Sequence, residues 1–204
     1  MVLCNMTEKK ALIEIKEAFT INGELNERYY HTLGVIEKAL ELNEIHNLKI
    51  PKEQVFLSAA FHDVAKFLDK KSMLEILDKY FHNIYQSLLE YPSIWHSFVG
   101  KIVAREKYGI IDDRILNAIC YHTTGRPNMT NLEKIIFISD YVEEKTRVGE
   151  CFEVARKAAN KNLNDAIVVI IEQTIAYLKK NNKPVYQLTE ETYQFYLKEV
   201  KKSV

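Results

Sequence analysis

Six histidine and aspartate side chains interrupt apolar stretches of this sequence, where a lone polar group is expensive. In AAFHDVAKF, residues 59–67, the adjacent His62 and Asp63 stand among apolar neighbours. A buried charge without a partner destabilises a fold by several kcal/mol, so such a pair needs a reason. The same conflict recurs in four other stretches, and the full set of candidates is His31, His62, Asp63, His96, His122 and Asp140.

These side chains could solve one another's burial problem by converging on metal. Imidazole and carboxylate groups suit divalent iron, manganese or zinc, and the lack of cysteine ligands disfavours a structural zinc site. Six protein ligands are too many for one catalytic ion with open positions, but they suit two ions that share a carboxylate. Asp63 is the candidate bridge between the ions.

The alternative to metal binding is that each histidine is a hydrogen-bonded core residue or a surface residue. For any one of them alone that is the commoner outcome, but the six residues together favour metal binding. His46 and His82 provide the contrast. Both are expected at exposed or C-terminal helix positions, where a basic side chain is favourable.

Helices must position the ligands, because apolar residues recur with the helical period and no segment alternates with a period of two. One predicted helix opens at Pro51 and carries His62 and Asp63. The others are expected at residues 7–19, 26–46, 72–81, 93–109, 114–122, 131–144, 164–180 and 189–202. The sequence therefore predicts an all-α fold with about nine helices in one domain.

Local signals mark the ends of several predicted helices. The pairs Ser72–Glu75 and Thr130–Glu133 are typical of capping boxes, in which two side chains satisfy the first backbone N–H groups of a helix. Gly109 is typical of the residue that follows the end of a helix. These signals support the helical interpretation around two of the ligands, His96 and Asp140.

Composition and charge exclude several classes of protein. The chain has 204 residues, 47% of them hydrophobic, which is enough to fill the core of one domain. Twenty-eight basic residues balance twenty-eight acidic ones, so neither nucleic acid nor a membrane surface is an expected partner. The longest apolar run, near AIVVII, is far shorter than the ~20 residues of a membrane span.

The cysteines and the start of the chain favour a cytoplasmic location. An odd set of three, Cys4, Cys120 and Cys151, without a CxxC pair, does not suggest a disulfide framework, so reduced thiols are expected. The opening MVLCNMTEKK lacks the apolar run of a signal peptide. The aromatic stretch TYQFYL near the end could contribute to a subunit contact, which leaves a homodimer open.

The motifs that contain these residues are similar to those of a known family. The order His31, His62-Asp63, Asp140 resembles the metal signature of the HD-domain phosphohydrolase superfamily. More narrowly, RYYHTLGV, AAFHDVAK, HSFVGK and ILNAICYHTTGRPNMTNLEKIIFISDYVE resemble the YqeK family, which comprises bacterial symmetrical dinucleoside-tetraphosphate hydrolases. The resemblance runs over residues 28–166, and YHTTGRPNMTNLEKIIFISDYVE is its most specific part.

The resemblance implies a single HD domain over residues 1–204, with the family-like core at 28–166 and a helical extension at the C-terminus. It implies two divalent metal ions, iron being the expected native pair, with manganese or cobalt as alternatives. His31, His62, Asp63 and Asp140 would hold one ion, and Asp63, His96 and His122 the other. The implied substrate is diadenosine tetraphosphate, which a hydroxide between the ions would cleave to two ADP.

Cationic and polar residues beside the ligands suit a chain of phosphates. Lys66 follows His62 by four positions, so it should project from the same edge of the helix, where it could contact phosphate or protonate the leaving group. Arg126 could bind phosphate through two N–H groups. The expected catalytic residues are Asp63 and Lys66, and the expected substrate contacts are Arg28, Lys66, Thr123, Thr124, Gly125 and Arg126.

Each of these assignments has a structural alternative. Lys66 could be a solvated lysine at a helix edge, and Arg126 could be a loop arginine paired with an acid. Arg147 is a weaker candidate for phosphate binding. Glu143, three residues after Asp140, either supports the metal ligands or is a surface acid.

The sequence departs from the family pattern at two places. Ser97 and Phe98 follow His96, where the family often has a small residue and a proline. Glu144 stands in DYVEEKTRVGEC where the family often has proline, and no Phe-Pro-Gly turn follows. This second segment would line the substrate side of the site.

Other functions stay open at the level of sequence. The chain could be another HD phosphohydrolase that acts on nucleoside monophosphates, nucleotide polyphosphates or cyclic diesters. It could be a regulator that keeps the metal site without turnover, although the complete ligand set argues against that role. A purely structural helical scaffold would need many buried polar groups without partners, which native proteins avoid.

Overall fold

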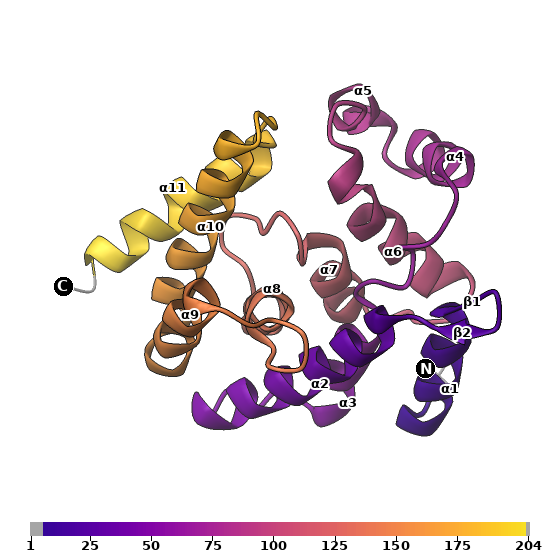
Figure 1. The fold of residues 1–204 in the computed structure, drawn as a ribbon, viewed down its shortest axis with the longest axis horizontal. Coiled ribbons are helices and arrows are strands. Elements are labelled where there is room, and N and C mark those ends of the chain that lie inside the picture. The colour runs from indigo at the N-terminus through magenta and orange to yellow at the C-terminus, as the bar shows by residue number, and fades with distance from the viewer. Residues whose placement is uncertain (1–5, 203–204) are drawn as a thin grey trace.

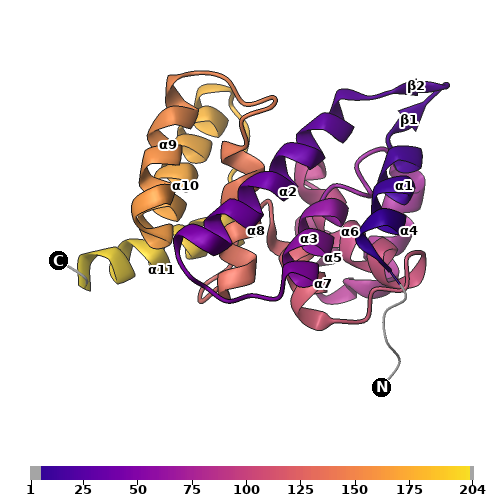
Figure 2. The same cartoon turned by 90° about the horizontal axis from the view of Figure 1, so that it is seen from below.

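Helices form nearly all of the structure, a computed structural model that describes residues 6–202 (Figures 1 and 2). The α-helices in this range are α1 (Glu8–Ala18), α2 (Glu27–Ile45), α3 (Lys52–Phe61), α4 (Lys70–Tyr80), α5 (Tyr85–Leu88), α6 (Trp95–Glu106), α7 (Asp113–Tyr121), α8 (Asn131–Val142), α9 (Glu150–Lys161), α10 (Leu163–Lys180) and α11 (Gln187–Lys202). Two 3₁₀ turns, His82–Ile84 and Pro92–Ile94, flank α5. The expected all-α class is confirmed.

The described residues contain eleven α-helices, where the sequence predicted about nine. The two additional helices are α5 and α9. Helix α5 is four residues long, too short to show an apolar period. Helix α9 buries only Ala155, Arg156 and Ala159, so its inner face is made of small residues and one arginine rather than large apolar ones.

A small hairpin also lay outside the sequence prediction. Strands β1 (Thr20–Ile21) and β2 (Glu24–Leu25) pair antiparallel, with Thr20 opposite Leu25. Asn22 and Gly23 form the turn with φ angles of 53° and 84°. An Asn-Gly pair with two positive φ angles is the preferred connection of a two-residue hairpin, so the dipeptide itself was the available signal.

The ends of two helices differ from the prediction. Asp69, not Ser72, caps α4, because the Asp69 carboxylate accepts from the backbone N–H of Ser72 at 3.0 Å. Helix α3 ends at Phe61, so His62 is its C-cap and Asp63 lies just beyond it. The predicted capping box of Thr130 and Glu133 at the start of α8 is confirmed.

Two groups of helices pack against α7 and α8. Helices α2 and α3 pack against each other, α2 packs on α8, and α3 packs on α7. Helices α9 and α10 cover the other side of α8, and α11 packs on α10. Helix α6 packs on α7 and also contacts α4 (Figure 1). The ends of α3 and α7 and the inner faces of α2, α6 and α8 can therefore share one site.

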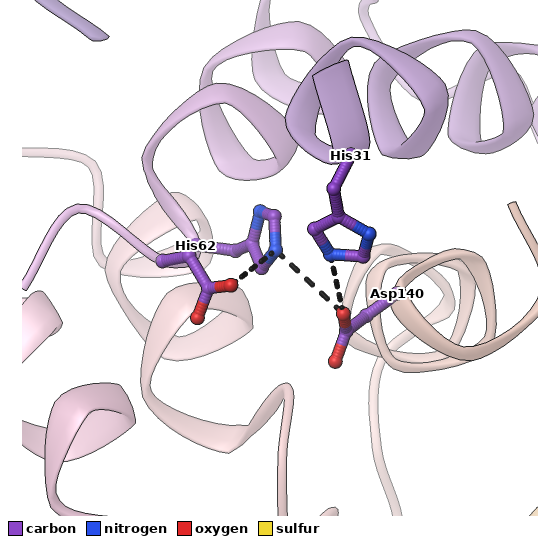
Figure 3. A group of neighbouring side chains, drawn as sticks. His31, His62 and Asp140 are labelled. Carbon is purple, nitrogen blue, oxygen red and sulfur yellow. Dashed lines mark hydrogen bonds and ion pairs between the residues drawn. The ribbon is translucent and has the colours of Figure 1, made fainter. Parts of the chain in front are cut away.

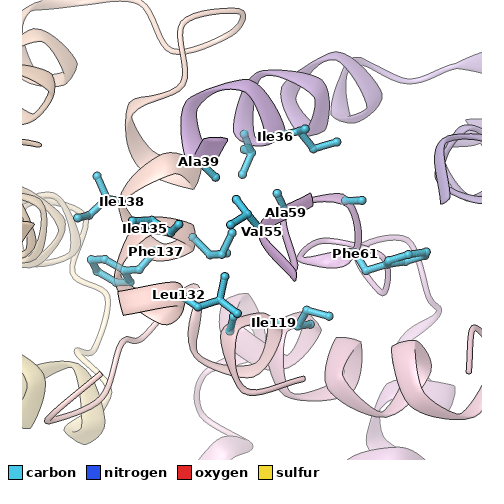
Figure 4. Packing of buried hydrophobic residues seen from close by; sticks show 14 of the residues in the cluster. Ile36, Ala39, Val55, Ala59, Phe61, Ile119, Leu132, Ile135, Phe137 and Ile138 are labelled. Atoms are coloured by element: carbon cyan, nitrogen blue, oxygen red, sulfur yellow. The ribbon is translucent and has the colours of Figure 1, made fainter. Parts of the chain in front are cut away.

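Buried apolar side chains hold this arrangement. Figure 4 shows the main core, in which side chains of α2, α3, α7 and α8 interdigitate. Its labelled members are Ile36, Ala39, Val55, Ala59, Phe61, Ile119, Leu132, Ile135, Phe137 and Ile138. A second apolar cluster joins α4, α5 and α6 and includes Trp95 and Phe98. Burial of apolar surface stabilises the folded state by about 25 cal/mol for each Å² that is removed from water.

Helix α11 packs against the loop that joins α7 to α8. The hydroxyl of Tyr196 accepts a hydrogen bond from the backbone N–H of Met129 at 2.8 Å. The side chain of Thr192 lies against Gly125, whose φ is +63° and which has no room for a Cβ. The last helix therefore fixes the conformation of residues 125–129.

Neither a membrane span nor a disulfide is found in residues 6–202. No helix in that range combines the length and the apolar character needed to cross a bilayer. Cys120 is a buried free thiol and Cys151 an exposed one, whereas Cys4 lies outside the described residues.

Candidate metal centre

The structure brings all six predicted ligands together from five helices. His31 comes from α2 and His96 from α6, while Asp140 comes from α8. His62 and His122 are the C-cap residues of α3 and α7. The ligand atoms form two groups, within each of which they lie no more than 4.8 Å apart: His31, His62, Asp63 and Asp140 in the first, and Asp63, His96 and His122 in the second.

The first group is shown in Figure 3, where His31, His62 and Asp140 point toward one another. His31 Nε2 lies 2.9 Å from Asp140 Oδ1. His62 Nε2 lies 3.4 Å from Asp63 Oδ2 and 3.8 Å from Asp140 Oδ1. Two imidazole nitrogens and two carboxylates therefore face one small volume.

The second group uses the other oxygen of the same aspartate. Asp63 Oδ1 lies 3.1 Å from His96 Nε2 and 3.6 Å from His122 Nε2. The two imidazole nitrogens are 3.2 Å apart. Because Oδ2 of Asp63 faces the first group and Oδ1 faces the second, this carboxylate has the geometry of a bridge.

Two of the histidines are oriented by a backbone carbonyl on the side away from the cluster. Nδ1 of His62 donates to the carbonyl of Ala59 at 2.6 Å, and Nδ1 of His122 donates to the carbonyl of Ile119 at 2.7 Å. A backbone carbonyl can only accept, so Nδ1 carries the proton in both rings. Each Nε2 then presents a lone pair to the cluster, which is the arrangement typical of metal-binding histidines.

Burial and neighbouring groups set the protonation of the site. Burial lowers the pKa of His96 to about 4, in spite of the nearby Asp63 carboxylate, and burial also lowers the pKa of His62. Burial by itself would raise the pKa of Asp63, but the adjacent imidazoles, led by His62, hold this pKa well below its ordinary value. The neutral imidazoles of His62 and His96 beside the ionised Asp63 carboxylate are donors that a divalent cation can bind.

Hydrogen bonding within the protein leaves part of this donor set unsatisfied. In residues 6–202, four buried side-chain polar atoms lack a hydrogen-bond partner, and two of these are His62 Nε2 and Asp63 Oδ1. An unpaired buried polar atom is costly, by about 1–3 kcal/mol each. The oriented nitrogens, the bridging carboxylate and these two atoms fit a pair of divalent ions coordinated by nitrogen and oxygen.

Three cations surround the cluster on its more exposed side. Arg28 Nη1 lies 2.9 Å from Asp63 Oδ2, and Lys66 Nζ lies 3.6 Å from Asp63 Oδ1. Arg147 Nη2 lies 3.6 Å from Asp140 Oδ1. The side chains of Arg28, Lys66, Asp140 and Arg147 are between 22% and 33% exposed, whereas those of the histidine ligands and Asp63 are at most 7% exposed. An anionic ligand would meet these cations as it approached.

Lys66 reaches the site by a different route from the one predicted. Residues 62–67 form turns rather than a continuing helix, and the backbone N–H of Lys66 bonds to the carbonyl of Asp63 at 2.8 Å. The ammonium nevertheless lies 3.1 Å from His96 Nε2. Its position beside the second ligand group supports the predicted role in substrate binding.

The four residues predicted as contacts in the loop after His122 separate into three cases. Thr123 Oγ1 lies 3.4 Å from His96 Nε2, at the edge of the cluster. Thr124 and Gly125 are buried, and the Thr124 hydroxyl donates to the carbonyl of Gly125. Thr192 of α11 lies against Gly125, so the side of the loop that carries these two residues faces the protein, and their contact with substrate stays a prediction.

Arg126 is paired with a buried acid. Its Nε and Nη2 donate to the two carboxylate oxygens of Glu133 at 3.0 and 2.8 Å. The guanidinium also lies over the ring of Tyr121, 5.0 Å from the ring centre. The structural alternative for Arg126 is thus observed, and the predicted contact with phosphate would fall to Nη1 alone.

Two residues are more closely tied to the site than the sequence suggested. Arg147 was a weaker candidate, yet it contacts Asp140. Glu143 is fully buried and accepts from Nδ1 of His31 at 3.1 Å. Burial opposes ionisation, but the hydrogen bonds from His31 and Thr146 lower the pKa of Glu143 to about 2. Its spacing of three residues from Asp140 was the available signal.

Comparison with protein families agrees with this geometry. The HD domain model matches residues 28–145, more than half of the chain. This match and the paired His/Asp groups define the chain as an HD-domain protein.

Individual relatives extend the match to almost the full length. The symmetrical bis(5'-nucleosyl)-tetraphosphatase of Bacillus subtilis is 38% identical over 191 residues, which cover 93% of this chain and 97% of that protein. A protein of the same name from Halalkalibacterium halodurans is 40% identical over 197 residues, covering 96% of this chain and all of the relative. The crystal structure of a predicted HD superfamily hydrolase involved in NAD metabolism from Clostridium acetobutylicum has a TM-score of 0.80 at 29% identity, over 95% of this chain and 98% of that one.

The chain belongs to the HD-domain family, in the group that contains the symmetrical bis(5'-nucleosyl)-tetraphosphatases. The family resemblance seen in the sequence motifs is thereby confirmed. Such a protein is a metal-dependent hydrolase, and the oriented donor set described above is consistent with that class.

Substitution of the shared carboxylate tests the bridge. We expect Asp63→Ala to lower metal content at both positions, because Asp63 contributes an oxygen to each group. We expect His96→Ala to empty mainly the second position. Elemental analysis after loading with Mn²⁺ and dialysis measures both effects, and His82→Ala, at an exposed side chain, is the matched control. If Asp63→Ala and His96→Ala lose the same single ion, Asp63 is not a bridge.

Proposed function

We propose that this protein hydrolyses diadenosine tetraphosphate symmetrically, to two molecules of ADP. The observation that carries the proposal is the pair of ligand groups joined by Asp63, with cations on their exposed side. The relatives that share nearly the full length of the chain bear the name of this activity. We propose iron as the native metal, with manganese or cobalt able to replace it.

The two ligand groups define where each ion would be held. His31, His62 and Asp140 would complete the first position, and His96 and His122 the second, with Asp63 between them. Two divalent ions held there would supply a Lewis acid for a phosphoryl oxygen and would activate water as a nucleophile. The chain's own contribution is to fix the imidazoles in one tautomer and to exclude solvent from the buried side of the site.

The cations beside the cluster suit the polyphosphate. Lys66 lies next to the second group, where its ammonium would contact the phosphates and offer a proton to the departing diphosphate. Arg28 and Arg147 lie next to the first group, on the side of Asp63 Oδ2 and Asp140. Cations on both sides of the two metal ions would hold the phosphates on either side of the cleaved bond.

The remaining proposals concern the whole chain. We propose one domain over residues 1–204 with its family-like core at 28–166, and a cytoplasmic location in which the thiols stay reduced. A homodimer through the aromatic stretch TYQFYL also stays a prediction. In this stretch Tyr196 is buried against the loop at Met129, so it is not free to contact a second subunit.

The products of the reaction test the proposed function. If the ions act on an inner phosphate, the leaving group is a whole nucleoside diphosphate, and ADP should be the only nucleotide formed from diadenosine tetraphosphate. Anion-exchange chromatography before completion separates this outcome from attack on an outer phosphate, which gives ATP and AMP. Equal amounts of ATP and AMP would contradict symmetrical cleavage. Turnover of a nucleoside monophosphate, without turnover of diadenosine tetraphosphate, would indicate another HD phosphohydrolase.

Loss of a cation should impair turnover without loss of metal. A charge-assisted hydrogen bond contributes about 1.5–3 kcal/mol, so we expect Lys66→Ala and Arg147→Ala each to reduce kcat/KM by roughly 10- to 100-fold. Metal content should stay at the level of the unchanged protein. Arg114→Ala, which removes an exposed arginine paired with Asp112, is the control. Normal kcat/KM in both variants would show that Lys66 and Arg147 are solvated surface cations without a role in turnover.

A further inference from the structure

Glu143 is a buried carboxylate to which the reaction assigns no role. It follows the last residue of α8 and begins the loop of residues 143–149. Its side chain has no exposed surface. An ionised carboxylate in such a place must be compensated by several donors, because burial without them is prohibitive. The identity of those donors therefore shows what the carboxylate holds in place.

The donors to Glu143 come from a metal ligand and from the loop. Nδ1 of His31 lies 3.1 Å from Glu143 Oε1. The backbone N–H of Lys145 donates to Oε2 at 2.6 Å, and the N–H of Thr146 lies 3.1 Å from both oxygens. The Thr146 hydroxyl also donates to Oε1. One carboxylate thus joins the ring of His31 to the turn that precedes Arg147.

Helix α2 leaves space for this carboxylate. Gly34 lies one turn after His31, and a Cβ at Gly34 would overlap Oε2 of Glu143. Glycine within a helix is less favourable than alanine by about 1 kcal/mol. The position of Gly34 therefore permits a close approach between α2 and Glu143 that any larger residue would prevent.

The backbone around Glu143 is fixed independently by a buried arginine of α9. The guanidinium of Arg156 donates to the carbonyl of Val142 at 2.7 Å and to the carbonyl of Glu143 at 2.9 Å. It also donates to the carbonyl of Arg147. Arg156 thus satisfies carbonyls at the C-terminal end of α8, where a cation is favourable. The side chain of Glu143 then extends from a backbone that is held in place at both ends of the turn.

We propose that Glu143 is a positioning residue that orients His31 toward the first metal ion and, through the same carboxylate, holds the turn that places Arg147 beside Asp140. Acceptance from Nδ1 fixes the tautomer of His31 and directs the Nε2 lone pair toward the first group. The proposal rests on the proposed two-metal function. It differs from a purely structural role, in which the carboxylate would only cap the loop and its loss would not act selectively on one ion.

Metal titration of a charge-neutral variant tests the proposal. Glu143→Gln keeps an acceptor oxygen but removes the charge, and loss of such a partner typically weakens metal binding about 10- to 100-fold. We expect that loss for one Mn²⁺ ion and little change for the other when the metal-free protein is titrated and free Mn²⁺ is counted by electron paramagnetic resonance. Glu144→Gln is the matched control, because Glu144 is the adjacent carboxylate, 64% exposed and paired with Lys38. Unchanged affinity for both ions in Glu143→Gln overturns the proposal, as does an equal loss of both.

Two further measurements keep the proposal testable if Glu143→Gln folds poorly. Gly34→Ala should displace the carboxylate and weaken the same ion, although alanine favours the helix. In the unchanged protein loaded with Zn²⁺, nitrogen-15 spectra should show His31 protonated at Nδ1 and metal-bound at Nε2; a proton at Nε2 overturns the proposal. These readouts need no substrate, so failure to hydrolyse diadenosine tetraphosphate would contradict the proposed function and leave this inference standing.

Discussion

The carboxylate of Asp63 is the interaction on which the site depends. One oxygen faces His62 and the other faces His96 and His122, so a single side chain belongs to both ligand groups. The carboxylate is almost fully buried, and the imidazoles around it, led by His62, hold its pKa well below the ordinary value. Arg28 and Lys66 also lie beside it. Each helix that packs around the site therefore contributes a side chain that interacts with Asp63 or with one of the side chains beside it.

The same local arrangement positions two of those donors, His62 and His122. His62 and His122 each follow the end of a helix, and each Nδ1 donates to the carbonyl three residues earlier, in the last turn. Carbonyls in the last turn of a helix lack partners within the helix. The same hydrogen bond thus completes the helix end and fixes the tautomer of a ligand. The core between α2, α3, α7 and α8 then brings both helix ends to one place.

The ligand set could be predicted because each ligand is a polar residue in an apolar stretch of sequence. A histidine or aspartate inside an apolar helix needs a partner, and six such residues in one chain have few ways to find partners other than one another. The helix ends were harder to predict: α3 stops at Phe61, and the turns after it bring Lys66 to the site by a path that periodicity does not show. The all-α class followed from periodicity alone, but the small-residue face of α9 did not give such a signal.

The residues whose surroundings the sequence did not reveal lie in loops whose shape is set by distant contacts. Thr124 and Gly125 follow a ligand in the chain, yet α11 covers them from sixty or more positions away, at Thr192. Glu143 and Arg147 lie in a segment that diverges from the family pattern, and their positions depend on Arg156 of α9. Local sequence spacing carries no information about such long-range contacts.

The central claim is that one carboxylate joins two metal positions. Diffraction from crystals grown with Mn²⁺ and measured at the manganese absorption edge tests it most directly. We expect two anomalous peaks in each chain, one among His31, His62 and Asp140 and one beside His96 and His122, with one oxygen of Asp63 bound to each. A single peak in a fully loaded crystal, or two peaks with Asp63 bound to only one of them, would contradict the account.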